Sequence, residues 1–183
     1  MTPISNLTFS FDDAGDRILL RCTLSDNALV TLQLTRRLTG PLLEKLANLL
    51  LKTSDMAASL PAKLQEEIIM MEHTRALAHI AALAEPSGGR DAFESEEKPP
   101  ARHLLTRIDF QPQPERCTLI FFCNGGEHPF TAITFNRAQL HWFVDTLDRF
   151  SLRADWEIRP YQRDWLVLRD ADGTAGRSMA SLH

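Results

Sequence analysis

Two arginines at similar places in the chain have the chemistry to recognise an anion. Arg36 and Arg137 each stand between a predicted strand and a predicted helix. A guanidinium group binds carboxylate or phosphate through two parallel hydrogen bonds. The pair therefore predicts duplicated anion recognition. The alternative, which we take as the default, is a structural role in which each arginine covers a sheet edge or pairs with a nearby carboxylate.

The histidines and cysteines do not have the spacing of a catalytic or metal site. His73 and His79 are six positions apart on a predicted helix, so they do not share a face as a metal-binding pair would. Cys22 and Cys123 lie in apolar, strand-like runs that match in the two halves of the chain. A redox pair is one interpretation of them, but buried free thiols explain them better. Cys123 and His128 flank a predicted turn, which does not build a Cys–His nucleophile.

The common catalytic motifs are absent from the sequence. There is no phosphate-binding glycine loop, nucleophile elbow, Cys-x-x-Cys pair or two-histidine zinc helix. Gly125-Gly126 has amides that an anion could bind, but a hairpin turn explains it, since Asn124-Gly125 between apolar runs is a strong hairpin signal. We therefore predict no cofactor, no metal and no catalytic residue.

The elements that position these residues occur twice. When the chain is shifted so that Leu7 falls on Ile108, the apolar patterns of the two halves coincide without a gap. Under this shift Arg36 falls on Arg137, and Cys22 falls on Cys123. A shared apolar pattern predicts a shared local structure. We therefore predict that residues 7–50 and 108–151 superpose as one fold.

Each half is predicted to contain three strands and then a helix. The strands are predicted at 7–11, 17–24 and 29–34 in the first half, and at 106–110, 117–123 and 130–135 in the second, because apolar runs are separated there by turn residues. Apolar residues at helical spacing then predict a helix in each half. The first is predicted to begin near Thr39 or Gly40, with Pro41 in its first turn. The second is predicted to begin with a capping box of Asn136 and Gln139.

A long helix and a polar linker are predicted between the halves. Residues 61–84 are rich in good helix formers, and the region that follows is polar and contains proline and glycine. Short strands are predicted at 156–158 and 165–168. The predicted organisation is a first unit at 1–55, a linking helix at 56–85, a flexible linker at 86–104, a second unit with C-terminal strands at 105–171, and a disordered tail at 172–183.

Composition limits the class of protein. The chain has 183 residues, of which 44% are hydrophobic and 24% charged, and its net charge is −4. These values are typical of a globular protein and provide no basic field for nucleic acid, so we do not expect a nucleic-acid partner. The start of the chain does not resemble a secretory signal, and no apolar run is long enough for a membrane span. We therefore predict a cytoplasmic protein without a membrane partner.

The fold class predicted from these patterns is α+β. The two βββα units are expected to form two antiparallel sheets or one continuous sheet, with helices on one face. The predicted function is a non-enzymatic protein–protein interaction or assembly protein, and the alternative is a regulator that binds a small ligand or anion in the cleft between the units. We expect a protein partner or a homodimer, because the apolar surface of the 61–84 helix is broad and needs more than one neighbour. The predicted interface residues are Ile69, Met70, Ala76, Ile80 and Leu83.

Overall fold

The computed structural model of the chain describes residues 1–83 and 100–158, apart from the side chains of residues 62 and 63. Its elements, in chain order, are β1 (Thr2–Asp12), β2 (Arg17–Leu24), β3 (Leu29–Leu34), α1 (Arg36–Lys52), α2 (Asp55–Ala58), α3 (Ala62–Leu83), β4 (Ala101–Pro112), β5 (Arg116–Cys123), β6 (Thr131–Asn136) and α4 (Arg137–Arg153). The predicted flexible linker at 86–104 lies outside the described residues up to residue 99, and the predicted strand at 165–168 and tail at 172–183 lie wholly outside them.

The six strands form one closed barrel in the order β1-β2-β3-β4-β5-β6. Pairing within each half is antiparallel, whereas β3 pairs with β4 and β1 pairs with β6 in parallel. The prediction of two separate sheets or one continuous sheet is therefore wrong in its arrangement. The two parallel ladders join strands that are far apart in the sequence, and both are short, with two residue pairs between β1 and β6 and four between β3 and β4.

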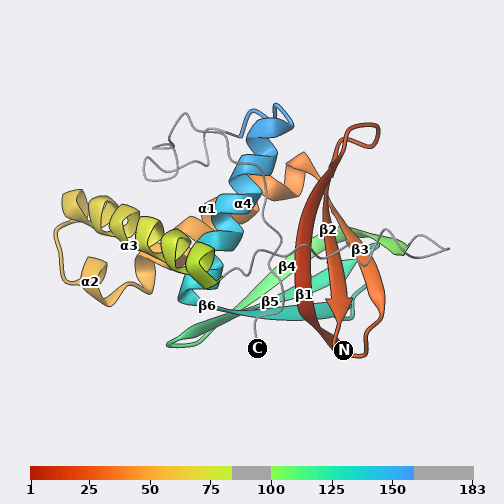
Figure 1. Ribbon diagram of the computed structural model, residues 1–183, viewed down its shortest axis with the longest axis horizontal. Helices are drawn as coiled ribbons and strands as arrows, with labels where there is room; N and C mark the ends of the chain where they lie inside the picture. The colour runs from red at the N-terminus through yellow and green to blue at the C-terminus, as the bar shows by residue number, and fades with distance from the viewer. Residues whose placement is uncertain (84–99, 159–183) are drawn as a thin grey trace.

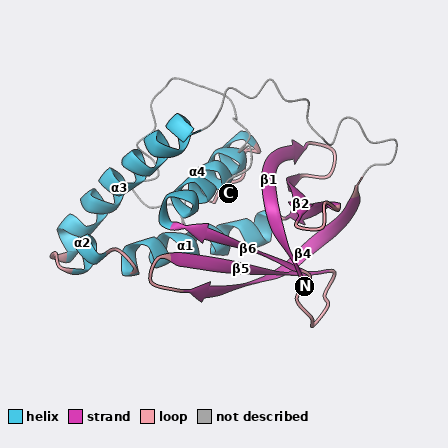
Figure 2. Cartoon of the chain, turned by 60° about the horizontal axis from the view of Figure 1, so that its bottom comes forward, coloured by secondary structure: helices cyan, strands magenta, loops and turns pink. Residues whose placement is uncertain are grey.

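The helices form a layer beside the barrel (Figures 1 and 2). Helices α1 and α4 lie next to the strands and contact each other, and α3 lies outside them against α4. The strand–helix interface is aromatic: the ring of Phe9 in β1 lies 5.6–5.8 Å from the rings of Trp142, Phe143 and Phe150 in α4. Because α3 does not contribute to this interface, its position depends on its contacts with the other helices.

The ladders of the two halves correspond with a shift that the sequence pattern does not show. Leu34 and Phe135 each end a third strand; Leu34 pairs with Ile18, and Phe135 pairs with Cys117. Ile18 therefore corresponds to Cys117, whereas the single ungapped shift places it on Leu119. The predicted match between the two second-strand cysteines is wrong for the same reason. The connection between β1 and β2 is longer than that between β4 and β5, whereas the connection between β2 and β3 is shorter than that between β5 and β6. The offset between corresponding residues of the two halves therefore changes at the second strand and changes back at the third.

Both long first strands contain a bulge at the corresponding place. The register shifts at Ser5 in β1 and at Thr106 in β4. The Ser5 hydroxyl donates to the carbonyl of Thr23 at 3.0 Å, and the Thr106 hydroxyl donates to the carbonyl of Phe122 at 3.1 Å. A bulge leaves one residue without a ladder partner. In both halves the side chain of that residue bonds to the neighbouring strand.

Two local predictions in the second half are confirmed. Asn136 and Gln139 form the capping box at the start of α4, with the backbone N–H of each residue bonded to the side chain of the other. Asn124 and Gly125 have φ values of 55° and 73°, as a tight hairpin turn requires. The Gly125 amide donates to the hydroxyl of Thr106, so it is used within the fold.

Helix α1 begins earlier than predicted. It starts at Arg36, because Thr35 caps it by accepting a hydrogen bond from the Leu38 amide at 3.3 Å. Pro41 consequently lies inside the helix, where it removes one helical hydrogen-bond donor. The cap at Thr35 stabilises the first turn although Pro41 follows it. The sequence prediction placed the start of the helix too close to this proline.

The middle and the end of the chain also differ from the predictions. The short helix α2 was not predicted, and α3 is close to the predicted 61–84 helix. Strand β4 begins at Ala101, inside the predicted linker, because its first residues pair with β3. Residues 156–158 are not a strand. Trp156 and Ile158 are instead buried in the core, and the Trp156 indole donates to Asp16 at 2.6 Å.

Candidate functional site

A cluster of polar side chains lies where α3 meets α4. Its centre is the ion pair between Glu72 of α3 and Arg137 of α4, in which both Nε and Nη2 of the arginine donate to Oε2 of the glutamate. Arg137 also donates to the Thr53 hydroxyl and to the Leu50 carbonyl, both at 2.9 Å. The Ser54 hydroxyl donates to Oε1 of Glu72 at 2.6 Å. This arginine therefore connects the end of α1, through Thr53 and Leu50, with α3.

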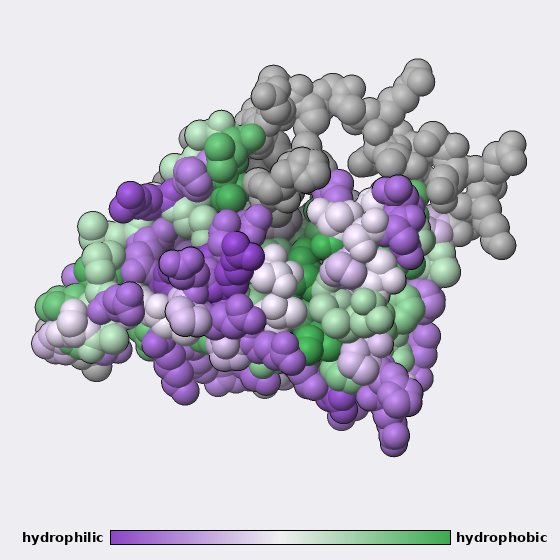
Figure 3. Space-filling model, turned by 90° about the horizontal axis from the view of Figure 1, so that it is seen from below, coloured by the Kyte–Doolittle hydropathy of each residue, from purple (hydrophilic) through white to green (hydrophobic). Residues whose placement is uncertain are grey.

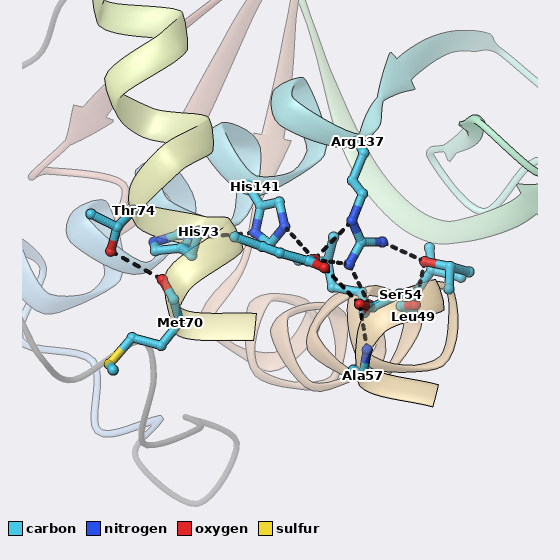
Figure 4. A network of polar contacts seen from close by, with 11 residues as sticks. Leu49, Ser54, Ala57, Met70, His73, Thr74, Arg137 and His141 are labelled. Atoms are coloured by element: carbon cyan, nitrogen blue, oxygen red, sulfur yellow. Dashed lines mark hydrogen bonds and ion pairs between the residues drawn. The ribbon is translucent and has the colours of Figure 1, made fainter. Parts of the chain in front are cut away.

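Two buried histidines continue the cluster along the same interface (Figure 4). Nδ1 of His73 in α3 lies 3.2 Å from Nδ1 of His141 in α4. Nε2 of His73 lies 3.4 Å from a carboxylate oxygen of Asp145, whose other oxygen accepts a 2.8 Å bond from Arg149. Neutral rings satisfy this arrangement when His73 donates to Asp145 and accepts from His141. Nε2 of His141 lies 3.9 Å from a carboxylate oxygen of Glu72, so the two parts of the cluster are adjacent there.

Burial sets the protonation state of His141. Removal from water, together with the repulsion of a positive charge by the neighbouring His73 and Arg137, lowers the pKa of His141 to about 3. His141 is therefore neutral near pH 7. A neutral ring matches the hydrogen bond from its Nδ1 to His73.

The two histidines of the cluster are buried, whereas Glu72 and Arg137 border an open hollow. Ser54 and His141 are each only 1% exposed, and the Ser54 hydroxyl also caps α2 by accepting from the Ala57 amide. A nucleophile or general base must reach the reacting group. Within the described residues, no group of histidine, cysteine and acidic side chains has the arrangement of a metal site. What this arrangement does is hold α3 on α4 through several charged and neutral hydrogen bonds.

An open hollow of about 340 Å³ lies beside the cluster. Its lining includes Asp55, Glu72, Glu115 and Arg137. The three carboxylates outnumber the single guanidinium, which is already bound to Glu72. The surroundings of this hollow therefore favour a neutral or cationic ligand over an anion.

The two arginines of the sequence prediction have different environments. Arg137 is half-buried in the cluster and lines the hollow, whereas Arg36 is exposed at the start of α1 and lines neither cavity that Arg137 lines. Anion recognition by Arg137 would have to displace Glu72. The structural role that the sequence favoured, pairing with a nearby carboxylate, fits Arg137.

The predicted interface residues fall on two faces of α3. Ile69, Ala76 and Ile80 are buried within the chain, Met70 is half-buried, and Leu83 is exposed. The uncovered surface of the helix is a different one, which we call the outer face of α3. We define it by Leu64, Glu67, Met71, Arg75 and Ala78, which are all exposed. Figure 3 shows hydrophobic and hydrophilic residues mixed at the end of the molecule where α2 and the start of α3 lie.

The outer face of α3 contains two large apolar side chains that the described part of the chain leaves exposed. Met71 is 64% exposed and Leu64 is 41% exposed, and Met56 of the adjacent α2 is exposed as well. Single exposed apolar residues need no explanation, but several on one helix indicate a binding surface.

The residues of the buried cluster were missed as a group. Arg137, His141, Asp145 and Arg149 recur every four positions along α4, so they lie on one face of that helix. This polar stripe was a usable signal in the sequence. Its partners on α3, Glu72 and His73, could not be matched to it without the packing of the two helices.

Comparison with known proteins shows no relationship for this chain. No family model, no curated protein and no solved structure matches it. Among the helices of the described ranges, none has both the length and the apolar character to cross a bilayer. The inference of function therefore depends on the geometry of the chain.

Proposed function

We propose that this chain is a non-enzymatic interaction and assembly protein that binds another polypeptide through the outer face of α3. The observation that carries the proposal is the exposure of Met71 and Leu64 on a helix whose opposite face is held by a buried polar cluster. A rigidly held helix with an apolar outer face is a common form of recognition surface. Methionine suits such a surface because its flexible thioether adapts to its neighbour.

The burial of the polar cluster supports a binding protein over an enzyme. The side chains with acid–base chemistry, His73, His141 and Glu72, are used to join α3 to α4. Catalysis requires such groups to contact a substrate. The three cysteines are buried free thiols, and burial raises their pKa values, which disfavours the reactive thiolate.

The alternative is a regulator that binds a small ligand or an anion in the cleft between the halves. The position of the hollow beside Arg137 supports this alternative, since residues from both halves of the chain line the hollow. Its excess of carboxylates argues against an anion there. We therefore place this alternative second.

We also propose that the two halves are copies of one βββα unit. The matching bulges at Ser5 and Thr106, with the same hydroxyl-to-carbonyl bond, support this relationship. The side-chain caps at Thr35 and Asn136, at equal distances before helices of 17 residues, support it as well. The change of offset at the second strand is explained by turn lengths, which vary readily between copies.

A site-specific crosslinking experiment in the source cell tests the interaction proposal. A photoreactive amino acid is placed at Met71, and in a control chain at Ala28, an exposed residue of the turn between β2 and β3. We expect position 71 to give a discrete crosslinked product whose formation is prevented by Leu64→Glu, and position 28 to give none. Failure of position 71 to crosslink, or identical products from both positions, would contradict the proposal.

A further inference from the structure

The apolar residues of the outer face of α3 follow the spacing of a helix pair. Leu64, Met71 and Ala78 are seven positions apart, which is close to two turns, so they form one line along the helix. The line is central to the 22 residues of α3, which extend over about 33 Å. A second helix laid along this line would cover all three residues.

The charged residues beside this line are arranged symmetrically about Met71. Glu67 lies four positions before Met71, and Arg75 lies four positions after it; both are exposed. None of the ion pairs within the described residues includes either of them. They are eight positions apart, about 12 Å along the axis, which is too far for them to pair with each other.

These positions make the face complementary to itself when two copies run antiparallel. A twofold axis at Met71 places Glu67 of each chain beside Arg75 of the other, which gives two opposite-charge pairs. The same axis places the large Leu64 opposite the small Ala78, so that the helices pack closely. In a parallel pair Glu67 would face Glu67, which is repulsive.

We infer that the partner of the outer face of α3 is a second copy of this chain, bound antiparallel about a twofold axis at Met71. The inference rests on the proposed function and names its partner. A closed twofold dimer uses the same patch on both chains, so that residue i meets residue j of the partner and residue j meets residue i. One helix pair is smaller than a standard stable interface, so the dimer is a weak one that forms with rising concentration.

Charge reversal provides the main test. Molar mass is measured by light scattering and sedimentation over a wide range of concentration for the wild type, Glu67→Arg, Arg75→Glu and the double reversal. We expect each single reversal to weaken the dimer on the order of tenfold, because it makes both cross-axis pairs repulsive. The double reversal should restore wild-type affinity. The two single-reversal chains, when mixed, should form a heterodimer that neither forms alone.

The orientation is tested by cysteine crosslinking. The native thiols are buried, so introduced surface cysteines are oxidised selectively. A chain with Leu64→Cys should crosslink to a chain with Ala78→Cys faster than either crosslinks to itself. Faster crosslinking of each chain to itself would indicate a parallel pair and would overturn the inference.

Controls separate a failure of this inference from a failure of the proposed function. Met71→Glu should give a folded monomer by circular dichroism and light scattering, and Ala28→Glu on the barrel should leave the dimer intact. A wild type that stays monomeric at every concentration overturns the homodimer. If position 71 still crosslinks to a different protein in the cell, the proposed function stands; if it crosslinks to nothing, both are wrong.

Discussion

Helices α1 and α4 follow the third strand of each half and have the same length, but they have opposite surroundings. At equivalent turns α1 has Arg36 and Glu44, both exposed, whereas α4 has Arg137, which is half-buried, and Asp145, which is buried. The difference comes from α3, which lies mainly on α4. The same residue type at the start of the helix that follows the third strand is a surface residue in one half and an interface residue in the other. The role of a charged residue here is decided by its neighbour in space.

The two arginines provide the sharpest test of this contrast. Arg137→Ala should lower the free energy of unfolding by about 2–4 kcal/mol, because it leaves the carboxylate of Glu72 without its main partner. The matched change Arg36→Ala should cost less than about 0.5 kcal/mol, as for an ordinary surface residue. Urea denaturation followed by circular dichroism measures both. Equal losses would show that the cluster does not hold α3 on α4.

The burial of His141 in α4 should make the free energy of unfolding depend on pH. The folded pKa of His141 is about 3, and its ordinary value is 6.5. Below pH 6.5 the unfolded chain binds a proton that the folded chain does not, so stability falls with pH, by about 1.4 kcal/mol per unit, until the pH approaches the folded pKa.

Comparing variants isolates this contribution from the other groups that titrate in acid. His73, Glu72 and Arg137 surround His141, so the carboxylate also contributes to the acid loss. His141→Gln should remove roughly 2 kcal/mol of the loss between pH 6.5 and about pH 5, whereas His79→Gln, at an exposed position on α3, should change nothing. Profiles of the same slope for all three chains would argue against a neutral buried His141.

The bulges allow a smaller comparison between the halves. Thr106→Val removes a hydroxyl that donates to Phe122 and accepts from the Gly125 amide, and we expect a loss of about 1–2 kcal/mol. Ser5→Ala removes a more exposed bond to Thr23 and should cost about 0.5 kcal/mol. Thermal unfolding of the two variants measures the difference. A larger effect at Ser5 would mean that the second bulge has no greater structural role than the first.

The cysteine thiols should show the smallest difference between the two halves. Cys22 is in the first half and Cys123 in the second, and both are buried. Burial raises the pKa of Cys123 to about 11, and that of Cys22 is raised as well. Iodoacetamide near pH 8 should therefore modify neither in the native protein but both in urea, as mass spectrometry would show. Rapid native modification of either would revive the redox-pair interpretation of the sequence.

The sequence determined the features that depend on residues close together in the chain. It predicted the order of three strands and a helix in each half, the extent of α3, the capping box at Asn136 and the turn at Asn124-Gly125. Each of these is set by backbone preference, by a hydrogen bond within a few residues, or by the spacing of apolar side chains. Physical chemistry over short distances is therefore readable from the amino-acid order.

Only the tertiary structure decided which distant segments meet. The parallel pairing of β3 with β4 closes the barrel, and the change of offset at the second strand moves Cys22 opposite Val30 and into correspondence with Phe121. The partnership of Glu72 with Arg137 depends in the same way on how α3 crosses α4. Such pairings depend on the summed packing of surfaces that lie far apart in the sequence. A single chain does not contain a local signal for them, because many partners would satisfy the same side chain equally well.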